Sequence, residues 1–172
     1  MAIRLLGLDP GLRATGWGIV DADGNTLSAV ANGTVCPDDK APLAERLHFI
    51  FSEVSKVIRD HEPNECAIEE TFVNKNPTST LKLGHARAAA MLSAAEAGLL
   101  VAEYTPNAVK KAVVGAGHAG KQQVEAMVRM LLPGHAPESS DAADALAVAI
   151  CHAHHRVSAD RLSKAIAGGR SR

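Results

Sequence analysis

The sequence lacks the features that mark several large classes of protein. No run approaches the roughly 18 consecutive apolar residues of a membrane span, and the apolar start at Met1–Leu8 is too short for a signal peptide. The three cysteines, Cys36, Cys66 and Cys151, lie far apart without a CxxC pair, which indicates neither a disulfide framework nor a zinc knuckle. We therefore expect a cytoplasmic protein with reduced thiols and no membrane partner.

A strong net charge is also absent. The formal net charge of −1 argues mildly against a nucleic-acid partner, because such partners usually require a basic face. The charge is unevenly distributed, however, since residues 72–130 hold seven basic residues and only three acidic ones. Residues 156–172 add five basic residues against one acid, with a Gly-Gly pair near the end. We expect residues 157–172 to form a basic, flexible tail after a domain of residues 1–156.

Length and patterning predict a single α/β domain. A chain of 172 residues that is 47% hydrophobic can build one sizeable core. Three strands joined by tight turns open the chain, and helices then alternate with strands, with a polar loop at 74–80. The expected strands are 3–9, 16–21, 26–35, 65–70 and 99–104, and the expected helices are 43–58, 81–97, 105–114, 122–132 and one from Ser139 or Ser140 to about His155. This order predicts a mixed five-stranded sheet flanked by helices on both faces, with functional groups at the carboxyl ends of the parallel strands.

Acidic residues follow two of the expected core strands. Asp9 follows the apolar run Leu5–Leu8 and precedes a Pro-Gly pair, so its carboxylate lies beside a tight turn. Burial there costs free energy unless the charge is paired. Glu69 and Glu70 close a short apolar strand, and because strand side chains alternate, only one of them can share a site with Asp9. The pattern alone does not choose between the two glutamates.

Two further acids begin the last expected helix. Asp141 and Asp144 are three residues apart, so they share one helical face. Capping by Ser140 and the helix dipole would explain Asp141 without any catalytic role. They explain Asp144 poorly, because the alanines at 142, 143 and 145 indicate a helix built for close packing.

The acids together indicate a site for hard cations. Carboxylates without an accompanying His–Cys set favour Mg²⁺ or Mn²⁺ over zinc. Two divalent cations would cancel the charge of four carboxylates. Metal ions about 3.5–4 Å apart commonly clamp the attacking water and the leaving oxygen during phosphodiester cleavage. The cluster therefore predicts two-metal phosphodiester hydrolysis.

The sequence resembles the RuvC family of Holliday junction endodeoxyribonucleases over nearly the whole chain to about His155. The segments that carry the resemblance occur in the family's order: Gly7-Leu8-Asp9-Pro10-Gly11 with Thr15-Gly16, Ala67-Ile68-Glu69, Leu81-Lys82-Leu83-Gly84 with Ala86-Arg87, Val113-Val114-Gly115, and Asp141-Ala142-Ala143-Asp144-Ala145-Leu146-Ala147. Their joint occurrence is highly specific. The resemblance implies an RNase H-like fold for the expected α/β sheet.

The resemblance also implies a mechanism and partners. It makes Asp9, Glu69, Asp141 and Asp144 the catalytic residues and metal ligands, and it selects Glu69 over Glu70. It implies two Mg²⁺ ions in each active site, with Mn²⁺ able to substitute. It further implies a homodimer that makes paired symmetric nicks in four-way junction DNA during recombination and DNA repair, together with the RuvA and RuvB branch-migration proteins.

Six residues are candidates for DNA contacts. Lys110 and Lys121 match family lysines near the active site, where a cation could offset charge on the phosphate, although a lone lysine is usually just solvated. Aromatic residues make up only 3% of the chain, and Phe72 lies at the edge of the polar loop. A hydrophobic plug would explain Phe72 equally well, but the resemblance points to stacking on an unpaired base. Further candidates for phosphate contacts are Lys75, Lys82 and Arg87.

Two other classes of function fit parts of the pattern. Asp9-Pro10-Gly11 is also similar to the first phosphate loop of actin-like nucleotide-binding proteins, but those proteins need a second such domain around the nucleotide. Another RNase H-like nuclease is the nearest enzymatic alternative. Lys82-Leu83-Gly84, Lys110 and Lys121 favour the junction resolvase.

Overall fold

The computed structural model describes residues 2–71, 76–134 and 136–169, and it describes side chains as far as residue 159. Within these ranges the chain forms one five-stranded sheet with the strand order β3-β2-β1-β4-β5. The strands are β1 (Ile3–Asp9), β2 (Thr15–Asp23), β3 (Thr26–Val35), β4 (Glu65–Glu69) and β5 (Leu100–Tyr104). The first three form an antiparallel meander, and β4 and β5 run parallel to β1. The predicted mixed five-stranded sheet is confirmed.

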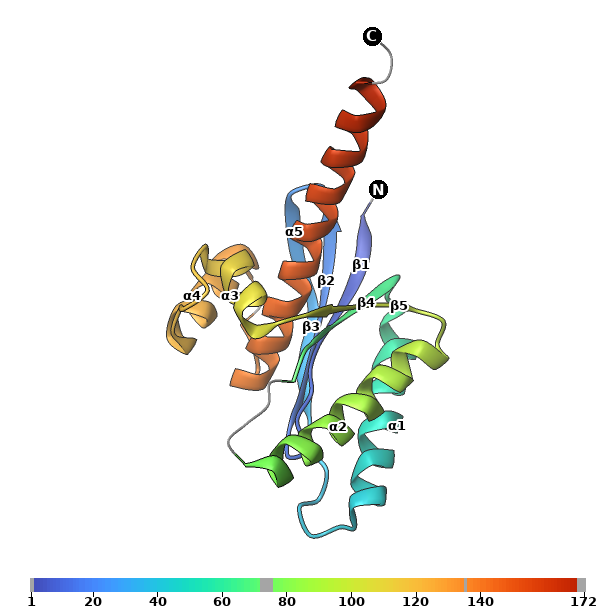
Figure 1. Ribbon diagram of the computed structural model, residues 1–172. Coiled ribbons are helices and arrows are strands. Elements are labelled where there is room, and N and C mark those ends of the chain that lie inside the picture. The colour runs from blue at the N-terminus through green and yellow to red at the C-terminus, as the bar shows by residue number, and fades with distance from the viewer. Residues whose placement is uncertain (1, 72–75, 135, 170–172) are drawn as a thin grey trace.

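Helices cover both faces of the sheet, as predicted (Figure 1). Helices α1 (Leu43–His61) and α2 (Pro77–Glu96) lie on one face, and α3 (Pro106–Val114), α4 (Lys121–Leu131) and α5 (Ser140–Gly169) lie on the other. Side chains of β1 alternate between the two cores, because Leu5 packs with α5 whereas Leu6 and Leu8 pack with α1 and α2. None of the described helices is long and apolar enough to cross a membrane.

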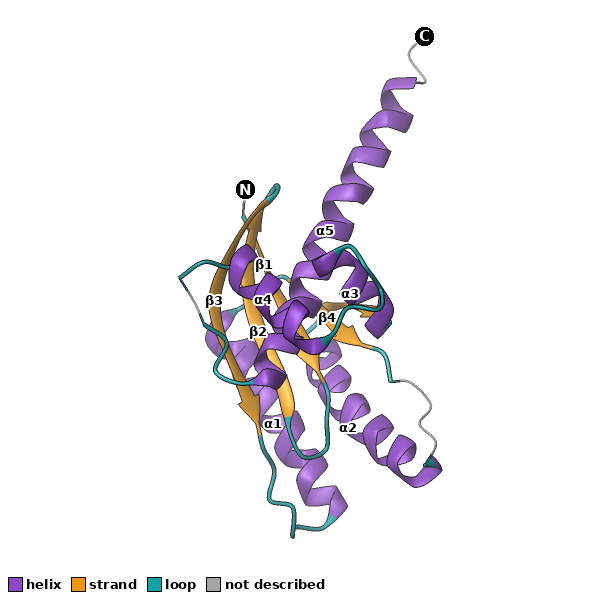
Figure 2. Cartoon of the chain, turned by 90° about the vertical axis from the view of Figure 1, so that its left-hand side faces the viewer, coloured by secondary structure: helices purple, strands orange, loops and turns teal. Residues whose placement is uncertain are grey.

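Two helices differ from the sequence prediction by four residues or more at one end. Helix α2 begins at Pro77 rather than at residue 81, because the side chain of Asn76 caps it by accepting hydrogen bonds from the amides of Thr78 and Ser79. The predicted polar loop at 74–80 is therefore wrong from Pro77 onward. Helix α5 runs to Gly169, well past the predicted end at His155, and projects beyond the sheet (Figure 2). The expected domain boundary after residue 156 falls inside this continuous helix.

Glycines on the sheet allow α5 to approach unusually closely. A Cβ atom on Gly7 would lie 2.1 Å from the carbonyl oxygen of Ala145, and one on Gly16 would lie 2.0 Å from the carbonyl oxygen of Asp141. The alanines that dominate the first turns of α5 complete this contact from the other side. The close approach places the start of α5, with its two aspartates, against the ends of β1 and β2.

We predict that Gly7→Ala destabilises the protein by about 1–3 kcal/mol, because the added methyl group forces α5 away from the sheet. Thermal or urea unfolding measures this effect. Gly117→Ala is the matched control, since a Cβ at Gly117 meets its nearest neighbour at an ordinary 3.6 Å. Equal stability of the Gly7→Ala and Gly117→Ala variants would show that α5 is not packed tightly on β1.

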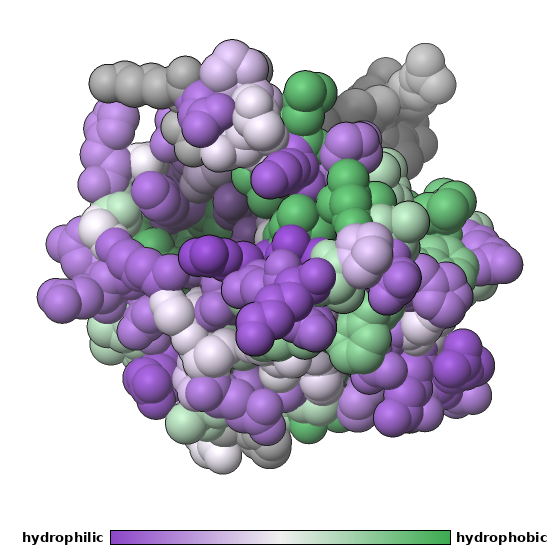
Figure 3. Space-filling view, turned by 90° about the horizontal axis from the view of Figure 1, so that it is seen from below, coloured by the Kyte–Doolittle hydropathy of each residue, from purple (hydrophilic) through white to green (hydrophobic). Residues whose placement is uncertain are grey.

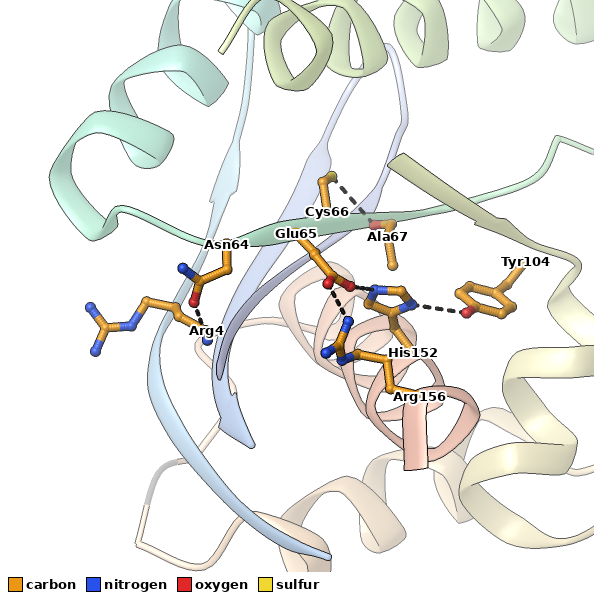
Figure 4. Close-up of polar contacts among 8 residues, drawn as sticks. All are labelled: Arg4, Asn64, Glu65, Cys66, Ala67, Tyr104, His152 and Arg156. Carbon is orange, nitrogen blue, oxygen red and sulfur yellow. Dashed lines mark hydrogen bonds and ion pairs between the residues drawn. The ribbon is translucent and has the colours of Figure 1, made fainter. Parts of the chain in front are cut away.

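A partly buried polar network joins α5 to β4 and β5 (Figure 4). His152 on α5 lies between the Tyr104 hydroxyl, 2.9 Å from Nδ1, and the Glu65 carboxylate, 2.8 Å from Nε2. Because a carboxylate can only accept, Nε2 donates to Glu65, and Nδ1 of the neutral ring accepts from Tyr104. Arg156 pairs with the other oxygen of Glu65. This network fixes the position of α5 along the sheet.

The network makes part of the stability sensitive to acid. Burial lowers the pKa of His152, and the charges of Arg156 and His155 add to this effect, although Glu65 opposes it. A histidine whose pKa is lower when folded contributes stability above its unfolded value of about 6.5 and loses that contribution as the pH falls. We therefore predict that His152→Gln is destabilising at pH 7.5 and that this deficit shrinks at pH 5.5. Melting curves test it, with exposed His48→Gln as the control; a deficit that does not depend on pH would contradict the assignment.

Candidate active site

Asp9 lies at the carboxyl end of the central strand β1. The turn that follows is braced by the fully buried Thr15, whose hydroxyl donates to the carbonyl oxygen of Gly11 at 2.8 Å. Asp9 itself pairs in register with Gly16 of β2. The alternation along β1, in which Leu5 faces α5, gives Asp9 the same side. Its carboxylate therefore lies on the side of the sheet covered by α5.

Glu69, and not Glu70, lies on this same side. In β4, Ala67 belongs to the core that contains α5, whereas Cys66 and Ile68 belong to the opposite core. Alternation then directs Glu69 toward α5 and Glu70 away from it. The electrostatic coupling of Glu69 to Asp9 agrees with this placement.

Asp141 and Asp144 lie in the first turns of α5. Ser139 caps the helix, because its hydroxyl accepts from the amide of Ala142 at 3.0 Å, and it also contacts the hydroxyl of Thr34 on β3 at 2.6 Å. The sequence offered Ser139 or Ser140 as the cap, and the structure uses Ser139. The cap therefore uses neither Asp141 nor Asp144, so capping does not explain the presence of either carboxylate.

The pKa shifts of these acids place them within electrostatic reach of one another. Burial raises the pKa of Asp9 to about 8, and the charges of Glu69, Asp144 and Asp141 add to the increase. Burial likewise raises the pKa of Glu69 to about 7, with a further contribution from Asp144. The pKa of Asp144 is also raised, first by burial. Such shifts are typical of carboxylates gathered for function, and the titrations belong to the group.

Two lysines offset part of this negative charge. Lys121, at the start of α4, places its Nζ 3.0 Å from Oδ2 of Asp144. Lys110 on α3 lowers the pKa of Glu69. Both lysines line a pocket of about 230 Å³ together with Glu69 and Asp144. The structure therefore brings the two predicted lysines to the predicted acids.

The donor set fits hard divalent cations. Once ionised, four carboxylates carry more negative charge than two lysines neutralise, and all of the identified donors are oxygens. Among residues whose positions are described, no three acidic, histidine or cysteine side chains converge as a ready-made metal group. The acids thus influence one another's ionisation without meeting at one point, as expected of mutually repelling charges.

The remaining DNA-contact candidates have different surroundings. Lys82 is exposed on α2. Arg87 is largely enclosed and paired with Glu103. Phe72 and Lys75 lie outside the described residues. Figure 3 views the molecule from the end at which β1 finishes, and hydrophilic side chains border a hollow on this face.

Sequence reasoning missed one acid near the site. Glu125 lies one turn after Lys121 on α4, raises the pKa of Asp144 and accepts a hydrogen bond from the Ser140 hydroxyl at 3.0 Å. The spacing of four residues between Lys121 and Glu125 was the available signal, because it places both on one helical face. Glu125 anchors α4 to the start of α5.

Comparisons with known proteins agree with the geometry. The family model described as crossover junction endodeoxyribonuclease RuvC matches residues 5–152. Proteins of that description from Rhodopseudomonas palustris and Rhodospirillum rubrum are 61% and 59% identical, over 93% and 97% of this chain and 92% and 99% of their own lengths. The solved structure of T. thermophilus RuvC in complex with a Holliday junction substrate is 34% identical, with a TM-score of 0.85 over 91% of this chain and 96% of that one.

These similarities cover most of the sequence, both of its cores and all four acids of the cluster. They confirm the RNase H-like form of the α/β fold. The chain belongs to the RuvC family of crossover junction endodeoxyribonucleases.

Proposed function

We propose that this protein is a metal-dependent endonuclease that resolves four-way DNA junctions in recombination and repair. The observation that carries the proposal is the coupled cluster of Asp9, Glu69, Asp141 and Asp144 beside two lysines. The chain belongs to a family in which one relative has been solved in complex with a Holliday junction substrate, and this supports the choice of substrate.

The four carboxylates would hold two Mg²⁺ ions, for which Mn²⁺ can substitute. Such ions supply an activated water and stabilise charge on the phosphate that is cut. The protein's own contribution is to hold the carboxylates on the rigid ends of β1, β4 and α5. Lys110 and Lys121 stand beside them, where a cation offsets the charge that develops on the phosphate.

Further contacts with DNA extend this site. We assign Lys82 and Lys75 to the phosphate backbone and Phe72 to stacking on an unpaired base at the crossover. Phosphate contacts fix the position of the strand, whereas stacking favours a junction in which bases are already unpaired.

A substrate panel tests the proposed function. Synthetic four-way junctions, duplexes and splayed DNA of the same sequence are incubated with the protein, with and without Mg²⁺. We expect cleavage confined to the junction and to the samples with Mg²⁺. Preferred cleavage of duplex DNA would instead favour another RNase H-like nuclease, and a separate assay that finds ATP binding without cleavage would favour the actin-like alternative.

Helix α2 supports a homodimer. One face of the helix is buried against the molecule's own core through Ala86, Ala90 and Ala94. The opposite face exposes a short apolar stripe made of two leucines, Leu81 at 66% exposed and Leu92 at 59% exposed. A second copy of the chain could cover this stripe and so place two active sites on the two strands to be cut.

We predict that Leu92→Glu yields a monomer in sedimentation and uncouples the two nicks on a cruciform plasmid. The free-energy cost of burying an unpaired glutamate in an apolar interface exceeds the stabilisation that one leucine side chain contributes there. Met130→Glu, which changes an exposed methionine on α4, is the control. A Leu92→Glu variant that remains dimeric would exclude α2 as the interface.

The resemblance also suggests cooperation with RuvA and RuvB and a cytoplasmic location, where chromosomal DNA is accessible. We assign nuclease activity to residues 1–156 and regard residues 157–172 as a basic extension. Stimulation of cleavage by added RuvA and RuvB would test the partnership directly.

A further inference from the structure

Arg87 contacts the backbone of the active-site glutamate. Its Nε donates to the carbonyl oxygen of Glu69 at 3.1 Å, and its Nη2 forms an ion pair with Glu103 on β5. Only 19% of the arginine side chain is exposed. The guanidinium therefore links α2 to the ends of two neighbouring parallel strands.

The position of Glu69 depends on how the end of β4 is held. Glu69 is the last residue of that strand, and the ladder with β1 ends one residue earlier, at the pair Leu8 and Ile68. On the β5 side the amide of Glu70 donates to the carbonyl oxygen of Tyr104 at 2.8 Å. Arg87 supplies the contact to the carbonyl oxygen of Glu69 itself.

The positive charge of Arg87 is paired with Glu103 and not with the carboxylate of Glu69. Its ion-pair partner is Glu103, whereas Lys110 on α3 lines the pocket beside Glu69. Arg87 thus contacts the backbone carbonyl of Glu69 rather than its carboxylate. That is the arrangement of a group that orients a metal ligand without binding the metal.

We propose that Arg87 is a positioning residue that holds the end of β4 so that Glu69 faces Asp9 and Asp144, and that Glu103 fixes Arg87 in this orientation. The inference rests on the proposed function and gives Arg87 a role other than the phosphate contact suggested by the sequence. The two roles predict different behaviour when either member of the pair is changed.

The first test is Arg87→Lys, which keeps the charge but loses the planar fork that reaches both acceptors. We expect the Mg²⁺ affinity of the DNA-free protein, measured by calorimetry, to fall roughly tenfold. The Mg²⁺ concentration for half-maximal cleavage should rise to a similar extent. Junction affinity in EDTA, and its dependence on salt, should match the wild type. Arg129→Lys, at an exposed arginine of α4, is the matched control.

The second test is Glu103→Ala, which separates the two roles. If Arg87 positions Glu69, this variant weakens Mg²⁺ binding in the same direction, and the double variant loses little more than either single one. If Arg87 contacts phosphate, removing Glu103 frees it, so junction binding tightens and its salt dependence becomes steeper. Glu103 is 49% exposed, so its replacement by alanine should leave the fold intact. The Glu103→Ala test therefore decides the role of Arg87 even if the Arg87→Lys variant does not fold.

Unchanged Mg²⁺ affinity in both variants, or tighter junction binding by Glu103→Ala, would overturn the proposal. The Mg²⁺ titration uses protein without DNA. A wild-type protein that binds Mg²⁺ but cuts a different substrate would therefore refute the junction activity, while the titration would still decide the role of Arg87.

Discussion

Replacing Asp9 with Asn will abolish junction cleavage and, at the same time, raise the melting temperature of the metal-free protein at pH 8. Loss of this carboxylate removes metal-dependent stabilisation worth several kcal/mol, which corresponds to a loss on the order of 10³-fold in rate. Junction binding should remain close to that of the wild type, because the lysines are unchanged. Cleavage rates and binding isotherms measure the two effects separately.

The gain in stability follows because folding raises the pKa of Asp9. Its pKa rises from 3.8 to about 8 on folding, so ionisation opposes the folded state. The protein is therefore most stable with Asp9 protonated, and it loses stability as the pH rises from about 4 to about 8. An asparagine has no charge to bury, so the variant should match the wild type near pH 4 and exceed it at pH 8. Asp60→Asn, at an exposed acid, is the control. Retained cleavage by Asp9→Asn would refute the assignment of the site.

Addition of Mg²⁺ will raise the melting temperature by much more at pH 8 than at pH 5.5. A ligand at 100 times its Kd stabilises by about 2.7 kcal/mol, which for a chain of this size corresponds to roughly 5–10 °C. At pH 5.5 the raised pKa values keep Asp9 and Glu69 largely protonated, so the ion must displace protons and binds less tightly.

Differential scanning calorimetry measures the shift in melting temperature, and titrations in buffers of different ionisation enthalpy count the released protons. The Asp9→Asn variant should show a much smaller shift. An equal Mg²⁺ effect in that variant would place metal binding elsewhere on the protein.

Much of this architecture was predictable because it depends on local pattern. The strand of Ile3–Asp9, the meander and the long amphipathic helix α1 all follow from periodicity and turn residues. The start of α2 was misplaced although Asn76 and Pro77 are a typical cap and first residue of a helix. The polar composition around them masked that signal.

The arrangement of the site needed information that no single segment contains. The choice between Glu69 and Glu70 depends on which face of the sheet α5 covers, and that is decided by the close approach at Gly7 and Gly16. The sequence suggested a phosphate contact for Arg87, because its partner Glu103 lies in a separate segment of the chain, on β5. Contacts between distant segments, rather than local propensities, determine these placements.

Anomalous diffraction from crystals soaked in Mn²⁺ tests the central claim most directly, because it locates the metal without relying on activity. We predict anomalous density in contact with the carboxylates of Asp9, Glu69 and at least one of Asp141 and Asp144, and its loss in crystals of Asp9→Asn. Density confined to other residues, or no density at Mn²⁺ concentrations that support cleavage in solution, would contradict the account.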